Sequence, residues 1–95
     1  MINPFTIIRT DGKFTVRMVE GTIVRDVECE NEDDARALAN VRPFYRAFEA
    51  EQVVDLQELQ KSIDAVERYG LTGFLRKGYH NLLYLKEDIQ SGKIK

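Results

Sequence analysis

The sequence predicts an α+β fold, a three-stranded antiparallel β-meander followed by three helices, with the last two forming a helical hairpin. Three observations predict it: alternating apolar residues in the first thirty positions, two turn signals within that stretch, and apolar residues spaced by three and four beyond it. A chain of 95 residues has the usual size of one domain. We expect a single domain over 1–95, with the meander over 3–29, the helical part over 31–91 and a frayed tail over 92–95.

The meander rests on two turn signals. Asp11-Gly12 is typical of a two-residue type I′ turn, in which both central residues take positive φ, and Glu20-Gly21 is a weaker signal of the same kind. Counting outward from the two turns predicts cross-strand pairs: Phe5 with Met18, Ile7 with Val16 and Arg9 with Phe14 in the first hairpin, and Met18 with Ile23, Val16 with Arg25, Phe14 with Val27 and Lys13 with Glu28 in the second. Because side chains alternate with period two, this register gathers apolar residues on one face of the sheet.

Arg25 is the anomaly of this register, because it falls on the apolar face. A buried guanidinium would need a carboxylate, which the acidic start of the first helix or Glu49 could supply. A β-bulge could instead turn it outward. We favour a third interpretation, in which Arg25 lies at the sheet edge and extends its charged end into water.

An acidic run follows the meander, and it includes Glu32, Asp33 and Asp34. A metal site is one interpretation, but the run lacks the ligand spacing and central glycine of an EF-hand loop. We favour the start of a helix, with Asn31 as N-cap and the carboxylates in the first turn, where the helix dipole stabilises them. Asp33 and Asp34 remain candidate protein-binding residues.

The apolar spacing predicts a first helix over about 32–51. Pro43 lacks an amide donor, so we expect a kink or a break and restart near Val41-Arg42. A second helix follows the N-cap Asp55 and ends at Gly70, a residue type that suits the left-handed C-cap position.

A third helix is expected from Thr72 or Gly73 to Gln90. Gly78 weakens this helix or lets a neighbour approach closely. The two helices around Gly70 also have the order of a helix-turn-helix motif. The second of them carries two glycines and few base-reading side chains, so we favour a helical hairpin that only packs.

The third helix carries a candidate binding strip. Arg76, His80 and Tyr84 are spaced by four residues and project in one line, with Lys77 beside them. Such a basic, aromatic strip could dock an acidic protein groove or a nucleic-acid backbone. The alternative is an ordinary solvated helix face.

The first strand offers a second candidate surface. It carries no charge before Arg9, so its edge suits β-strand addition by a protein partner or by a second copy of the chain, which would give a homodimer. Ile8 lies on the polar face of the sheet with Val19 and Val24, and these three could form a small apolar patch.

The residues that carry chemistry are few. His80 is the only histidine and Cys29 the only cysteine, and the glycines form no phosphate-binding loop. We therefore predict no enzymatic activity, no catalytic residue, no cofactor and no metal site. A formal net charge of −2 argues against sequence-independent binding to phosphate backbones.

A single cysteine favours a reducing compartment, no apolar run approaches the length of a membrane span, and the N-terminus lacks the features of a signal peptide. The sequence thus predicts a cytoplasmic protein without membrane contact. We expect a small non-enzymatic protein-binding module, an inhibitor or regulator of the kind that phages and mobile elements often encode. The alternative is a nucleic-acid-binding regulator that uses Arg76, Lys77 and His80.

Overall fold

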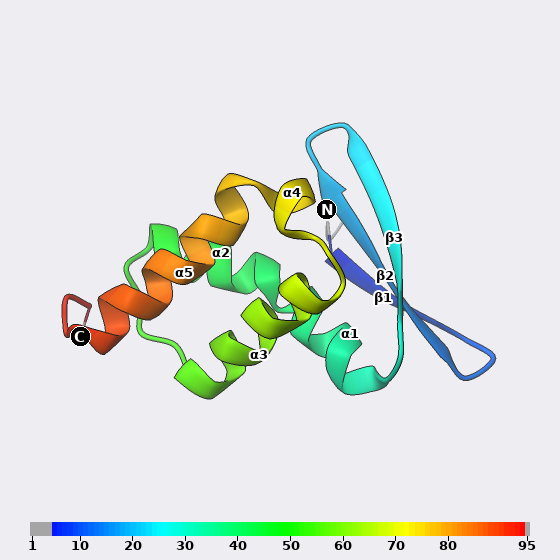
Figure 1. Cartoon of the computed structure of the whole chain (residues 1–95), viewed down its shortest axis with the longest axis horizontal. Coiled ribbons are helices and arrows are strands. Elements are labelled where there is room, and N and C mark those ends of the chain that lie inside the picture. Colours follow the sequence, from blue (N-terminus) through cyan, green and yellow to red (C-terminus); the bar gives the residue numbers. More distant parts are fainter. Residues whose placement is uncertain (1–4, 95) are drawn as a thin grey trace.

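A computed structural model describes residues 5–94. It contains a three-stranded antiparallel sheet in the order β1-β2-β3, followed within the described range by five helical segments, and it confirms the α+β class. The elements are β1 (Phe5–Thr10), β2 (Lys13–Glu20), β3 (Ile23–Cys29), α1 (Glu32–Ala39), α2 (Val41–Glu49), α3 (Leu56–Arg68), α4 (Thr72–Leu75) and α5 (Lys77–Gln90). The helices lie on one side of the sheet, and α1 packs directly against all three strands (Figure 1).

The first hairpin has the predicted register. Asp11 and Gly12 form its turn with φ of 50° and 77°, the two positive values that a type I′ turn requires. The observed pairs are Phe5 with Met18, Ile7 with Val16 and Arg9 with Phe14. Local turn chemistry alone was enough to set this register.

The predicted register of the second hairpin is wrong by two residues. Its loop is Gly21-Thr22 rather than Glu20-Gly21, because Gly21 takes the positive φ, 61°, at the first loop position, where type II′ turns place glycine. The observed pairs are Met18 with Arg25, Val16 with Val27, Phe14 with Cys29 and Thr15 with Glu28, while Lys13 pairs with Thr10 in the first hairpin. A shift of two residues leaves every side chain on its predicted face.

Arg25 is exposed, as we favoured. Arg25 lies on the exposed part of β3, and its guanidinium carbon lies 5.9 Å from the centre of the Phe74 ring. This is a cation–π contact at the surface, not a buried ion pair. The buried part of the sheet is instead centred on Val16 and Met18, which are fully covered.

The first predicted helix breaks at Asn40 and restarts as α2 at Val41, where the restart was expected. Asn31 caps α1 as expected, because its side-chain oxygen accepts a hydrogen bond from the Asp34 amide at 2.8 Å. Pro43 is the third residue of α2. In the first turn of a helix the missing amide of proline has no intrahelical partner to lose, so α2 starts just ahead of it.

Helix α3 has the predicted ends. The carboxylate of Asp55 accepts hydrogen bonds from the amides of Gln57 and Glu58 at 2.8 and 3.2 Å, and Gly70 takes a φ of 67° after the last turn. The buried hydroxyl of Ser62 donates to the Ala37 carbonyl oxygen at 2.7 Å, which fixes α3 against α1. Helix α3 also packs against α5, so the predicted helical hairpin is confirmed.

The prediction of one continuous third helix is wrong. The chain forms a short α4, turns at Arg76 with φ 52° and ψ −117°, and starts again as α5. The close approach that Gly78 was expected to permit is confirmed, since a Cβ atom there would lie 2.0 Å from the hydroxyl oxygen of Tyr45. Helix α5 packs onto α2. The chain therefore turns at Arg76 and does not continue from α4 as one straight helix.

The chain beyond α5 also differs from the frayed tail expected over 92–95. Gly92 takes a φ of 80°, and the amides of Lys93 and Ile94 donate to the carbonyl oxygen of Asp88 at 2.9 and 3.2 Å. The Ile94 side chain is 8% exposed and joins the core. Lys95 and the expected start of the meander at residues 3 and 4 lie outside the described residues.

Candidate functional site

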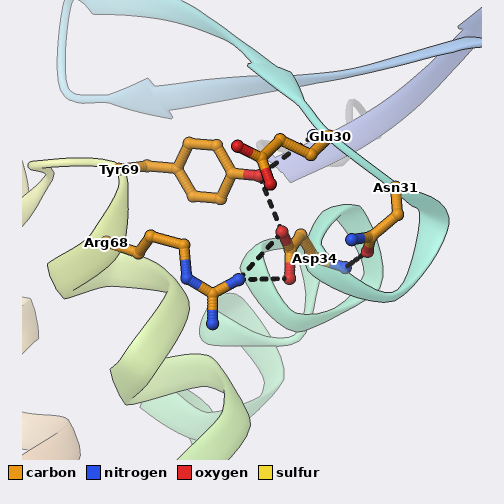
Figure 2. Close-up of polar contacts among 5 residues, drawn as sticks. All are labelled: Glu30, Asn31, Asp34, Arg68 and Tyr69. Atoms are coloured by element: carbon orange, nitrogen blue, oxygen red, sulfur yellow. Dashed lines mark hydrogen bonds and ion pairs between the residues drawn. The ribbon is translucent and has the colours of Figure 1, made fainter.

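The acidic segment links α1 to the end of α3 through hydrogen bonds of Asp34 with Arg68 and Tyr69, a contact that we call the tie. Asp34 accepts hydrogen bonds from Arg68 Nη1 at 3.0 Å and from the Tyr69 hydroxyl at 2.7 Å, and its side chain is only 13% exposed. The Tyr69 oxygen in turn accepts from the Glu30 amide at 3.0 Å. Figure 2 shows these contacts closing around Asp34 from two helices and the β3–α1 loop. Asp34 is therefore placed in a structural network, whereas Asp33 is exposed.

Two titratable groups beside this network are held in their neutral forms. Burial raises the pKa of Tyr69 to about 12, and the nearby Asp34 carboxylate adds to the effect. Burial also raises the pKa of the Cys29 thiol to about 11. A thiol with a raised pKa carries little thiolate near neutrality, so Cys29 is unsuited to act as a nucleophile.

Arg76, His80 and Tyr84 do not form the single line on a helix that the sequence predicted. Arg76 lies outside the helix at the α4–α5 turn, so it does not continue the line of His80 and Tyr84. His80 is exposed on α5. Tyr84 is 54% exposed and stacks on Phe48, with ring centres 6.4 Å apart. The structure therefore separates Tyr84, which extends the α2–α5 contact, from the cationic pair Arg76 and Lys77.

A cleft lies where the β2–β3 turn meets the α4–α5 turn, and Figure 1 shows these two turns approaching one another at the same end of the molecule. Its volume is about 390 Å³. The lining comes from both turns and combines apolar, cationic and acidic residues: Glu20, Ile23, Phe74, Leu75, Arg76, Lys77 and Gly78. Ile23 is 57% exposed, an unusual position for a large apolar side chain at the mouth of a cleft.

Four cations lie at or near this cleft. Arg76 and Lys77 line it, the Arg25 guanidinium lies over the Phe74 ring at its wall, and Arg42 lies near the Glu20 carboxylate. None of the four belongs to an ion pair among residues 5–94, and the same holds for Lys13, Arg46 and Lys86. We call this surface, the cleft with Arg25, Arg42, Arg76 and Lys77, the basic cleft.

Polar atoms without partners lie under the basic cleft. In the described structure, Glu20 Oε1, Arg42 Nε and the Tyr45 hydroxyl are buried and make no hydrogen bond. Burial raises the pKa of the Glu20 carboxyl, and the Arg42 guanidinium opposes part of that shift. Burial likewise raises the pKa of Tyr45, with the Glu20 carboxylate adding to it. Buried polar groups are nearly always hydrogen-bonded, so these three atoms are exceptions within the described structure.

The outer face of the sheet is the remaining candidate surface. No described helix covers it (Figure 1), and Arg17 crosses it to bond Asp26 in a bidentate pair at 2.9 and 3.1 Å. Ile8 is half-buried on this face, and Val24 is 58% exposed. The strand order leaves β1 at an edge of the three-stranded sheet, and its use for strand addition stays a prediction.

The sequence indicated Arg76 and Lys77 as candidate binding residues but not the residues around them. Glu20 was expected in a turn, and Tyr45 and Phe74 were not singled out as site residues. Gly78 was the one available signal, because a glycine within a helical pattern indicates a close neighbour. The identity of that neighbour, Tyr45, depends on the packing of α2 against α5 and is not written in the local sequence.

Within residues 5–94, no cluster of three or more histidine, cysteine, aspartate or glutamate side chains is arranged to hold a metal ion. None of the described helices is both long and apolar enough to cross a membrane. Comparison of the chain with protein-family models, with curated proteins and with solved structures gives no match.

Proposed function

We propose that this chain is a non-enzymatic protein-binding module that docks a partner through the basic cleft. The observation that supports the proposal is one cleft that Arg76 and Lys77 line together with the exposed Ile23 and with Phe74, over whose ring the Arg25 guanidinium lies. Unpaired cations beside apolar surface are what an acidic, partly apolar protein segment needs for both steering and affinity.

The overall charge favours a protein partner over a polyanion. The chain as a whole carries a formal net charge of −2, which does not favour attraction to a polyanion. A partner with scattered negative charge and apolar side chains matches that surface better than a continuous phosphate backbone does. A module of this kind suits an inhibitor or regulator acting in the reducing cytoplasm, including one encoded by a phage or mobile element.

Charge reversal tests the proposal. The variant Arg76→Glu/Lys77→Glu is used as bait beside the wild type in quantitative affinity capture from the native host. A matched control, Lys13→Glu/Lys61→Glu, makes the same change in net charge at exposed positions far from the basic cleft. We expect the first variant to lose a partner that wild type and control both retain, with circular dichroism showing that all three are folded. Equal recovery by all three baits would contradict the proposal.

The same cations support a second candidate function, a nucleic-acid-binding regulator. Arg76, Lys77 and the exposed His80 lie within one turn of each other and could contact phosphates. Titration of labelled single- and double-stranded DNA at increasing salt separates the candidates, since phosphate contacts make binding strongly salt-dependent. Absence of retention at low ionic strength removes this second function.

A further inference from the structure

Strand β3 is the edge of the sheet opposite to β1, and its backbone has open hydrogen-bonding groups. The two-residue β2–β3 loop is closed by Glu20 and Ile23, which therefore form a hydrogen-bonded pair. Such pairs alternate with non-hydrogen-bonded ones in an antiparallel ladder, so Val24, Asp26 and Glu28 present their amides and carbonyl oxygens away from β2. All three residues are exposed, and among residues 5–94 no backbone hydrogen bond from outside the sheet reaches them.

The side chains along this edge carry charges of both signs. Asp26 and Glu28 lie on the outer face of the sheet, and Arg25 lies on the face toward the helices. Arg17 already pairs with Asp26 at 2.9 Å. Arg25 and Glu28 belong to no ion pair among the described residues. The edge thus offers an unpaired cation and an unpaired carboxylate, one on each face.

These charges disfavour pairing of β3 with a second copy of itself. A two-fold axis perpendicular to the sheet would pair two β3 edges antiparallel. The registers that overlap most of the strand then place Arg25 opposite Arg25, Asp26 opposite Asp26, or Asp26 opposite Glu28. Like charges directly opposite one another destabilise a strand pair. The edge therefore selects against its own copy and suits a strand with the complementary charge pattern.

The open edge is continuous with the basic cleft. Ile23 begins β3, lines the cleft and is 57% exposed. Arg25 lies on the same face of the sheet, and its guanidinium carbon is 5.9 Å from the centre of the Phe74 ring in the cleft wall. A residue opposite Arg25 on an added strand would share this face, on which Arg76 and Lys77 line the cleft. Three cations thus favour a carboxylate at that position.

We infer that a protein partner adds an extended segment to β3 as a fourth, antiparallel strand, with an apolar side chain opposite Val24, a carboxylate opposite Arg25 and a basic side chain opposite Glu28. This inference rests on the proposed function and names the form of the partner segment. Backbone hydrogen bonds supply affinity in such strand addition, and the alternate side chains supply specificity. A nucleic-acid backbone has no amides with which to continue the ladder.

The probe is the peptide Lys-Val-Thr-Glu-Val-Ile, blocked at both ends, whose Lys, Glu and second Val fall opposite Glu28, Arg25 and Val24. It is added to the ¹⁵N-labelled full chain, and amide hydrogen exchange is followed residue by residue. We expect slowed exchange at Val24, Asp26 and Glu28, because the peptide bonds their outward groups. The outward amide of Ile7 on β1 is the reference and should be unchanged. No protection on β3, or equal protection at Ile7, overturns the inference.

Exchange of the two charges tests the side-chain pattern. The peptide Glu-Val-Thr-Lys-Val-Ile has the same composition but places like charges opposite Glu28 and Arg25, so we expect it to bind several-fold more weakly. The variant Arg25→Glu/Glu28→Lys, changed at two exposed positions, should reverse the preference between the peptides. Equal affinity of the wild type for both peptides, or an unreversed preference in the folded variant, overturns the inference.

Loss of single ladder bonds separates strand addition from contact through side chains alone. N-methylation of the peptide Thr removes its hydrogen bond to Asp26 and should abolish binding, whereas N-methylation of the Glu, whose amide points away from β3, should not. Equal effects of the two overturn the inference. In the chain, Val24→Pro removes an outward amide and leaves the β2–β3 ladder intact. If this variant, shown folded by circular dichroism, still captures the partner that Arg76→Glu/Lys77→Glu loses, the inference fails and the proposed function stands.

Discussion

At the scale of single residues, the contact between Tyr45 and Gly78 positions the candidate site. The aromatic ring comes from α2 and reaches the first turn of α5, where only hydrogen occupies the side-chain position. Tyr45 also meets Phe5 edge-on, with ring centres 6.3 Å apart, so the ring is fixed from the sheet side as well. A ring packed on both sides has little freedom to move away from an added methyl group.

Gly78→Ala should therefore destabilise the fold. The added Cβ would lie 2.0 Å from the Tyr45 hydroxyl oxygen and 2.4 Å from the ring carbon that bears it, so the ring or the helix must shift. We expect a loss of about 2 kcal/mol in the free energy of unfolding, as for other overpacked core positions, measured by urea denaturation. Gly73→Ala is the control, since a Cβ there has nothing within 4 Å and should be tolerated. Equal effects of the two substitutions would contradict the packing described.

Arg25 and Glu20 show how far single residues could be predicted. The exposed position of Arg25 followed from the cost of burying a guanidinium without a carboxylate. Its contact with Phe74 did not follow, because Phe74 is distant in sequence and reaches the hairpin only through the placement of α4. The same placement turns Glu20 from a turn residue into part of a cleft.

At the scale of elements, the turn between α4 and α5 is the strained point of the chain. Arg76 takes a φ of 52° with ψ of −117°, a conformation that residues with a Cβ adopt at a cost. Strained backbone of this kind persists where surrounding packing enforces it, and it is often found at binding sites. Here it places a cation at the rim of the basic cleft.

Arg76→Gly should relieve this strain. We expect the free energy of unfolding to rise by about 1 kcal/mol, because glycine adopts positive φ without steric cost, while partner binding weakens through loss of the guanidinium. Arg76→Ala keeps the Cβ, and it should lose binding without the gain in stability. Thermal and urea unfolding of both variants measure the difference. A glycine variant no more stable than the alanine variant would show that the turn is unstrained.

The β3–α1 loop is attached to the end of α3 through Asp34, and this tie is separate from the basic cleft. Asp34→Ala removes the partner of Arg68 and of the Tyr69 hydroxyl together. We expect a loss of about 2 kcal/mol in the free energy of unfolding, the usual cost of breaking part-buried, charge-assisted hydrogen bonds. Asp33→Ala, at the exposed neighbouring position, should cost much less. Comparable losses from both would indicate a general role of negative charge at the helix start.

Elements were predictable where local chemistry decides them. Asn31, Asp55 and Gly70 end or begin helices through contacts within a few residues, so their positions could be read from the sequence. The break at Arg76 could not, because no proline or cap residue marks it. The register of the second hairpin was missed because Gly21 can serve as either the first or the second residue of a two-residue loop.

At the scale of the whole molecule, ionisation of Tyr69 and Cys29 should lower the free energy of unfolding at alkaline pH. Tyr69 and Cys29 have pKa values of about 12 and about 11 in the folded chain, both raised mainly by burial. In the unfolded chain they ionise at their ordinary, lower pKa values, so the folded state holds more protons. Their contribution to stability is therefore complete below about pH 9 and is lost as pH rises toward 12.

We expect the free energy of unfolding to fall between about pH 9 and about pH 12, measured by urea denaturation in matched buffers. Tyr69→Phe should be less stable near neutrality, because Asp34 loses a donor, but its decline with pH should be shallower. A wild-type profile that stays flat through this range would show that neither group is held neutral by the fold.

The acidic β3–α1 segment and the basic cleft lie at opposite ends of β3. The formal net charge of the chain is −2. Composition predicted the small net charge and the absence of a general affinity for polyanions. It could not predict which cations would remain without ion pairs, because that depends on which helix ends the fold brings beside the hairpin.

The most direct test of the account is the recovery of a protein partner by three baits in quantitative affinity capture: the wild type, Arg76→Glu/Lys77→Glu, and the control Lys13→Glu/Lys61→Glu. The first variant changes two residues that line the basic cleft, and the control makes the same change in net charge at exposed positions that do not line it. We expect the wild type and the control to retain a partner that the first variant loses. Equal recovery by all three folded baits would contradict the account.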